Sequence, residues 1–193
     1  MLMNVDPHLL ALVRAAAARH ALDPALVCAV VEQESAWNPF AMRYEPAFRA
    51  RYVAPLGLPI TEEVARSISW GLMQVMGQVA RENGFDAKFL SALCEPAVGL
   101  DCGCRVLATK LAIAAREAAN FEAGAEQGSA PHAIEFAAST ARDSAAQTNG
   151  ASAHNDVEAF PSRNVLVRAL ALWNGGADPA YPADVFARMG RYR

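Results

Sequence analysis

The chain has 193 residues, of which 53% are hydrophobic and 19% charged, and its formal net charge is −3. This length is enough to bury a full core in one domain, which we place over 1–193. The nearly balanced charge argues against a nucleic-acid partner held by a broad basic face. No run approaches the ~18 apolar residues that a membrane span needs.

The N-terminus, Met-Leu-Met-Asn-Val-Asp-Pro, lacks the charged start and apolar core of a signal peptide. We therefore expect synthesis in the cytoplasm without ordinary Sec export. A substrate outside the cytoplasm would then require another route.

The four cysteines are expected to be free thiols. They show no spacing typical of metal ligands, so no metal site is predicted. A bridge between Cys94 and Cys102 is the alternative, and Cys28 and Cys104 complete the set.

Two helices are predicted near the N-terminus. Asp6-Pro7 is typical of a helix start, because aspartate caps the end and proline fits the first position. Asp23-Pro24 begins a second helix in the same way, and Asn38-Pro39 is expected to stop it. A DNA-binding helix-turn-helix is an alternative, but residues 24–36 contain no Lys or Arg to hold phosphates.

Glu34 is the candidate catalytic residue, because it lies on the valine-rich stripe that faces the core. The negative end of the helix dipole disfavours a carboxylate anion there, and partial burial raises a carboxyl pKa. A carboxyl that keeps its proton near neutral pH can act as a general acid. A solvated glutamate, or one paired with arginine, is the alternative that periodicity alone favours.

The residues that follow this glutamate indicate a protein family. Glu34-Ser35-Ala36-Trp37-Asn38-Pro39 resembles the Glu-Ser-x-aromatic-Asn-Pro signature of lytic transglycosylases with the soluble-transglycosylase domain, relatives of goose-type lysozyme. In that family the glutamate is the single catalytic acid and base.

Residues 40–60 are predicted to be irregular, because prolines and Gly57 interrupt them. Tyr44 and Glu45, beside Arg43, have the aromatic and charged side chains of a sugar-binding lip. A local ion pair between Arg43 and Glu45 is the alternative. The segment looks like a feature of phage-type muramidases, and 43–68 is an inserted loop region relative to the compact transglycosylase pattern.

Residues 69–77 resemble the family's Gly-Leu-Met-Gln-Ile-Met-Pro segment, with Gly77 in place of proline. Gln74 offers an amide and a carbonyl to sugar groups or to the Glu34 carboxyl, and Met73 is a second candidate for substrate binding. A core helix with methionine filler is the alternative. Short helices are predicted from residue 61 and over 78–83, and a long one over roughly 96–118.

Residues 120–162 change character, because no leucine occurs between Leu111 and Leu166. Such a stretch cannot bury much apolar surface, so we expect a flexible insertion, helical at most around 131–146.

The helical period returns over 162–173 and ends at Asn174-Gly175-Gly176. Residues 169–176 resemble the family's Ala-Ala-Tyr-Asn-Ala-Gly motif, with Trp173 in place of tyrosine. Tryptophan keeps a stacking face but lacks the hydroxyl that lies near the catalytic glutamate in the family. Tyr181 matches the closing aromatic.

The resemblance covers residues 22–42, 69–112 and 164–192. It implies a mainly α, lysozyme-like single domain with at most a small β element, and peptidoglycan glycan strands as the partner. Cleavage of the MurNAc–GlcNAc β-1,4 bond by Glu34, as acid and then base, would leave 1,6-anhydro ends without a cofactor. Ser35, Gln74 and Asn174 would orient groups, while Tyr44, Trp173 and Tyr181 would line the groove.

Two other functions remain open. The first is a hydrolytic muramidase, with Glu45 or Asp101 positioning water. The second is a non-catalytic peptidoglycan-binding or virion structural protein. The protein is expected to be a monomer that reaches the wall through phage lysis, a virion or a dedicated export route.

Overall fold

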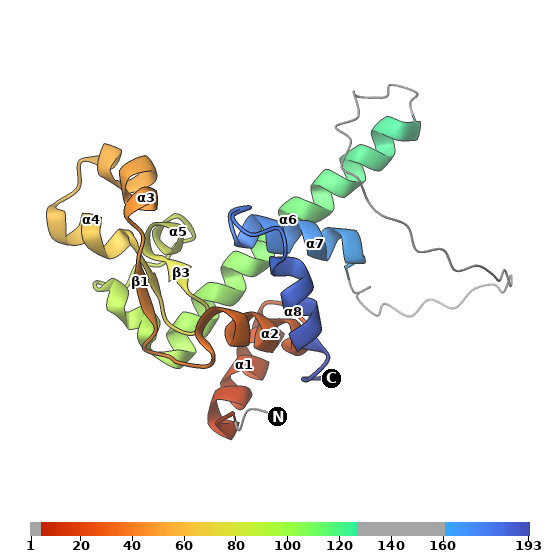
Figure 1. The fold of residues 1–193 in the computed structure, drawn as a ribbon, viewed down its shortest axis with the longest axis horizontal. Coiled ribbons are helices and arrows are strands. Elements are labelled where there is room, and N and C mark those ends of the chain that lie inside the picture. The colour runs from red at the N-terminus through yellow and green to blue at the C-terminus, as the bar shows by residue number, and fades with distance from the viewer. Residues whose placement is uncertain (1–4, 127–160) are drawn as a thin grey trace, which may run out of the picture.

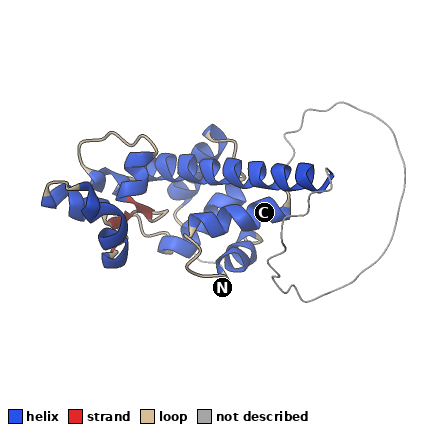
Figure 2. Cartoon of the chain, turned by 90° about the horizontal axis from the view of Figure 1, so that it is seen from above, coloured by secondary structure: helices blue, strands red, loops and turns tan. Residues whose placement is uncertain are grey.

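The computed structural model describes residues 5–126 and 161–193, which form a mainly helical fold with one small sheet (Figure 1). Most helices lie on one side of the molecule, and the sheet lies with several short helices on the other. The long helix α6 (Pro96–Glu126) runs through both sides (Figure 2). The expected fold class, mainly α with a small β element, is confirmed.

The first two helices begin where the sequence predicts. Helix α1 (Pro7–Arg19) is capped by Asp6, and α2 (Pro24–Ser35) by Asp23, whose Oδ1 accepts a hydrogen bond from the Ala25 amide at 2.8 Å. Helix α2 ends two residues earlier than expected, because Ala36 and Trp37 adopt positive φ values of 48° and 67°. Glu34 therefore lies in the last turn.

The sheet is antiparallel and has the order β1-β2-β3. Its strands are β1 (Met42–Tyr44), β2 (Ile68–Trp70) and β3 (Val75–Met76), so the 69–77 segment is a strand, a turn and a strand rather than a core helix. Trp70 of β2 lies opposite Met42 on one side and Val75 on the other.

The short helix predicted from residue 61 is observed as α4 (Ile60–Arg66). Residues 46–56 before it form short helical turns, which corrects the expectation that 40–60 are irregular. They are α3 (Pro46–Phe48), a π-helical turn (Arg49–Val53) and a 3-10 turn (Ala54–Leu56). Helices this short contain too few turns for an apolar period to appear in the sequence.

Helix α5 (Gly77–Glu82) and a 3-10 turn (Leu90–Cys94) lead into α6. Helix α6 continues to Glu126, eight residues past the predicted end at 118, so the first residues of the expected insertion 120–162 are helical. The part of that insertion over 127–160 lies outside the described residues.

Three glycines allow α6, the turn between β2 and β3 and the 3-10 turn Leu90–Cys94 to pack closely together. A Cβ on Gly71 or Gly99 would collide with the carbonyl oxygen of Leu93, and one on Gly103 would collide with the Met73 side chain. Gly71 also has a φ of +68°, a conformation that costs glycine little. These contacts fix the turn between β2 and β3 against α6.

The chain closes with α7 (Arg163–Trp173), which packs on α6, and α8 (Tyr181–Met189), which packs on α2. Helix α7 ends at Asn174, as predicted, where Gly175 and Gly176 take positive φ. Helix α2 is central, because every residue from Ala25 to Val31 is buried.

The cysteines are free thiols, as predicted. Burial raises the pKa of Cys28 to about 11 and that of Cys104 to about 12, so both stay protonated at neutral pH. Over 5–126 and 161–193 no group of His, Cys, Asp or Glu is placed to hold a metal ion. No helix in these ranges is long and apolar enough to cross a bilayer.

Candidate active site

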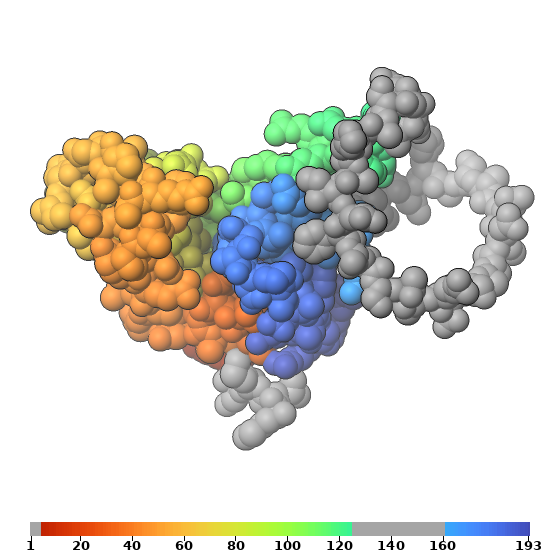
Figure 3. Space-filling view, turned by 45° about the horizontal axis from the view of Figure 1, so that its top comes forward, coloured from red at the N-terminus to blue at the C-terminus, as the bar shows by residue number. Residues whose placement is uncertain are grey.

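Glu34 lies at a cavity of about 460 Å³ between the two sides of the molecule. Figure 3 shows the hollow between the segment after β1, in orange, and the C-terminal helices, in blue. Helix α2 contributes Glu34, and the rest of the lining comes from β1 to β3, the segment after β1, α5, α6 and the end of α7. The glutamate is half-buried there.

Two donors converge on one oxygen of this carboxyl. The Tyr181 hydroxyl donates to Glu34 Oε1 at 2.6 Å, and the Trp173 Nε1–H donates to the same oxygen at 2.9 Å. No described residue donates a hydrogen bond to Oε2. Because Oε1 already accepts two hydrogen bonds, the carboxyl proton is favoured on Oε2.

Burial raises the pKa of Glu34 above its ordinary value, because the charged form loses hydration. The hydrogen bonds from Tyr181 and Trp173, and the charge of Arg43, act in the opposite direction, and burial outweighs them. Glu34 therefore keeps its proton to higher pH than a solvated glutamate. This is the environment that its position on the helix predicted.

Tyr181 lies beneath the carboxyl rather than along the groove, which differs from its expected place. It is 5% exposed at the start of α8, and it is absent from the cavity lining among the described residues. Burial and the adjacent Glu34 charge raise the pKa of Tyr181, so its hydroxyl stays a donor.

Trp173 has two contacts at the site. It lines the cavity, as expected, and its indole N–H replaces the hydroxyl that we expected to be lost. The next residue, Asn174, also lines the cavity, and its Nδ2 donates to the Asp178 carbonyl at 3.0 Å.

Gln74 lines the cavity but does not contact Glu34. Its Nε2 donates to the carbonyls of Ala41 and Gly71, both at 2.9 Å, and its Oε1 accepts from Ser69 Oγ at 2.9 Å. The side chain therefore stabilises the turn between β2 and β3, and its hydrogen-bonding groups are largely used there.

Two other expected site residues point away from the cavity. Ser35 Oγ donates back to the Val31 carbonyl at 3.1 Å, so it does not orient groups around Glu34. Met73 is 1% exposed and packs against Gly103 in the core. The expectation that Met73 binds substrate is wrong, because the turn places its side chain under α6.

Arg43 and Glu45 form the ion pair that was the alternative for their segment, and both also line the cavity. Tyr44 lies between these two residues in the sequence but is not part of the cavity lining, although it is 46% exposed. The expectation that Tyr44 lines the groove is therefore not met.

The sequence reading missed several cavity residues, among them Phe48, Tyr52 and Lys110. Phe48 and Tyr52 are four residues apart, which is a helical spacing that brings side chains together. That spacing was a usable signal, whereas nothing near Lys110 in the sequence indicates that α6 brings it to the cavity.

Comparison with known families adds one finding. The family described as "Transglycosylase SLT domain" matches residues 11–123, which contain Glu34 and the 69–77 segment but not Trp173 or Tyr181. The searches of curated proteins and of solved structures found no match.

Proposed function

Because that match spans more than half of the chain, the protein belongs to the SLT transglycosylase family, and we propose that it forms 1,6-anhydro ends in peptidoglycan. Family membership supports a transglycosylase-type activity with peptidoglycan as substrate. The bond proposed is the β-1,4 link between MurNAc and GlcNAc. The observation that carries this proposal is a half-buried Glu34 at the cavity, whose pKa burial raises and whose Oε1 accepts both fixed donors.

In the first step Glu34 Oε2 gives its proton to the glycosidic oxygen, and the bond from that oxygen to the muramic C1 breaks. The carboxylate that forms is stabilised at once, because Tyr181 and Trp173 already donate to Oε1. These donors are in place before the reaction and need no reorganisation. The GlcNAc fragment leaves with a free 4-hydroxyl.

In the second step Glu34, now a carboxylate, accepts the proton of the muramic 6-hydroxyl. That oxygen bonds to C1, which the substrate's own acetamido group has stabilised meanwhile. The proton returns to Glu34 and no water is consumed, so one residue serves as acid and then base, as in retaining glycosidases.

Hydrolysis by a muramidase is the second candidate, because Glu45 lines the same cavity. A second carboxylate could activate water, but the Arg43 guanidinium pairs with Glu45. Asp101, the other residue considered for this role, is excluded. It pairs with Arg19 at 3.1 Å and with His20 at 3.0 Å, both of α1, and is not part of the cavity lining.

Mass spectrometry of the products from purified sacculi tests the proposal. We expect anhydro ends, lighter than reducing ends by one water. Glu34→Gln should reduce turnover by about 10²–10⁴-fold, while Glu45→Gln should still give anhydro ends. Reducing ends that disappear in Glu45→Gln would establish hydrolysis instead. If folded wild-type protein binds sacculi without turnover, the non-catalytic peptidoglycan-binding function is favoured instead.

A further inference from the structure

An aromatic pair from the segment after β1 forms part of the cavity wall. Phe48, at the end of α3, and Tyr52, in the following π-helical turn, line the same cavity as Glu34. Their ring centroids are 4.9 Å apart and the rings are tilted by 47°. Tyr52 is 49% exposed, so the pair presents apolar surface to the cavity.

The aromatic pair is held by its own turn. The Arg51 guanidinium lies 5.1 Å from the Tyr52 ring centroid, a cation–π contact that restrains the ring. Val53 is fully buried, and Arg49 forms an ion pair with Glu63 of α4, whose side chain is 11% exposed. The backbone between these residues is therefore anchored on α4.

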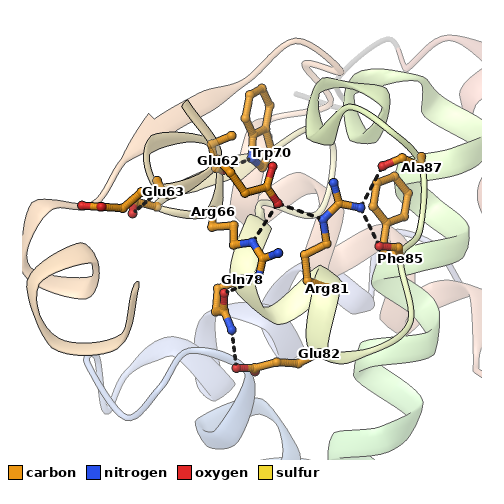
Figure 4. A network of polar contacts seen from close by, with 11 residues as sticks. Glu62, Glu63, Arg66, Trp70, Gln78, Arg81, Glu82, Phe85 and Ala87 are labelled. Carbon is orange, nitrogen blue, oxygen red and sulfur yellow. Dashed lines mark hydrogen bonds and ion pairs between the residues drawn. The ribbon is translucent and has the colours of Figure 1, made fainter. Parts of the chain in front are cut away.

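Helix α4 is in turn anchored on α5 (Figure 4). Glu62 Oε1 accepts from Arg66 Nε at 2.8 Å and from Arg81 Nε at 3.3 Å. Arg81 Nη1 also donates to the carbonyls of Phe85 and Ala87, at 2.7 and 2.8 Å. The chain of contacts from α5 to the aromatic pair fixes the pair before any ligand arrives, which lowers the ordering cost of binding.

The polar groups beside the aromatic pair suit a sugar ring. Pyranose rings have flat C–H faces that pack on aromatic side chains, and hydroxyl and acetamido groups at their edge. The Arg43–Glu45 ion pair and the Lys110 side chain from α6 line the same cavity, so the cavity holds charged donors and an acceptor together with the apolar surface. A purely apolar partner would leave these charges desolvated.

We propose that Phe48 and Tyr52 form a binding subsite for an N-acetylhexosamine ring of the glycan strand, in the groove that contains Glu34. The subsite rests on the proposed function for its ligand class. The sequence predicts that residues 43–68 are inserted relative to the family's compact pattern, and the proposed subsite lies within that segment.

The test measures binding without turnover. Glu34→Gln protein, alone or combined with Phe48→Ala, Tyr52→Ala or Tyr52→Phe, is titrated against purified sacculi in a pelleting assay. Phe89→Ala is the matched control, because Phe89 is 66% exposed and lies outside the cavity. Thermal melting of each variant checks that it is folded.

We expect Phe48→Ala and Tyr52→Ala each to weaken binding by about tenfold, in line with the worth of a buried aromatic contact. Tyr52→Phe should bind within about twofold of the parent, because it keeps the ring, and Phe89→Ala should match the parent. Unchanged affinity in both alanine variants overturns the subsite, even if wild-type protein digests sacculi. If the alanine variants bind more weakly but the wild type does not digest sacculi, the subsite is supported and the proposed enzymatic function is contradicted.

Discussion

At the scale of single residues, the two oxygens of the Glu34 carboxyl have different hydrogen-bonding environments. Oε1 of Glu34 is held by Tyr181 and Trp173, and Oε2 has no donor among the described residues. Glutamine can occupy the same place, because its carbonyl oxygen accepts the same two hydrogen bonds. The substitution removes the charge and little else.

The first prediction concerns the stability of Glu34→Gln against pH. The folded pKa of Glu34 is raised, so its contribution to stability is complete below the ordinary value of 4.5 and is lost as pH rises through the folded pKa. Glutamine does not titrate. We therefore expect the variant's melting temperature to match the wild type near pH 4 and to exceed it increasingly above about pH 4.5, which thermal melting across pH measures. A gap that is constant with pH would contradict the raised pKa.

The second prediction concerns Tyr181→Phe. The hydroxyl favours the carboxylate, so its loss should raise the pKa of Glu34 further. The alkaline limb of kcat/KM, where the acid loses its proton, should move to higher pH. Turnover should fall as well, because the carboxylate formed in the first step loses a donor. The pH profile on sacculi measures both.

Tyr192→Phe is the matched control for this experiment. Its hydroxyl donates to Glu32 at 2.6 Å and not to Glu34, so the alkaline limb should stay where it is. An equal displacement in both variants would mean that general loosening, not the hydrogen bond to Glu34, moves the pKa.

At the scale of elements, helix starts were predictable because their signals are local. Asp6-Pro7 and Asp23-Pro24 each place a cap and a proline at adjacent positions, and both helices begin there. The same reasoning placed the end of α7 at Asn174. Residues 46–56 offer a weaker local signal, the four-residue spacing of Phe48 and Tyr52, because their short turns depend on packing against α4.

The third prediction concerns the contact between α2 and the turn after α8. Glu32 is 9% exposed, accepts from Tyr192 OH and pairs with Arg191. Glu32→Ala leaves both donors without their acceptor, and since Arg191 is half-exposed we expect a loss of about 1.5–3 kcal/mol in the free energy of unfolding. Denaturant melts measure it.

Glu117→Ala is the control for that measurement. Glu117 pairs with Arg168 at 2.7 Å, but both side chains are exposed to solvent. Solvent and salt screen such pairs, so stability should hardly change. Equal losses in the two variants would show that Glu32 is no more important than a surface ion pair.

At the scale of the whole molecule, the hydrogen bonds to Glu34 join distant parts of the chain. Trp173 and Tyr181 lie 139 and 147 residues from Glu34 in sequence. The sequence motifs predicted that Glu34, Trp173 and Tyr181 lie near one another. Which Glu34 oxygen the two aromatic residues contact depends on how α7 packs on α6 and α8 on α2. The sequence could therefore predict that Glu34 lies partly buried near the two aromatic residues, but it could not predict the indole N–H as a donor or the burial of Met73 and Tyr181.

In the proposed enzyme, the two sides of the molecule have different roles in catalysis and in substrate binding. The helical side holds the acid and its donors, whereas the side with the sheet holds the facing wall with Phe48 and Tyr52. The wall depends on the contacts of Glu62 with Arg66 and Arg81. Loosening these contacts should therefore affect binding of the glycan strand more than the acid chemistry.

The last prediction tests this division with Glu62→Ala. The substitution removes the acceptor shared by Arg66 and Arg81, so α4 loses part of its attachment to α5 and the aromatic pair is less well held. We expect KM for sacculi to rise several-fold while kcat at saturation and the alkaline limb of the pH profile stay near the wild-type values. Tyr181→Phe should show the reverse pattern, with a displaced limb and a KM that changes little. A displaced alkaline limb of the pH profile in Glu62→Ala would contradict this division. The pKa of Glu34 would then depend on contacts made on the opposite side of the cavity.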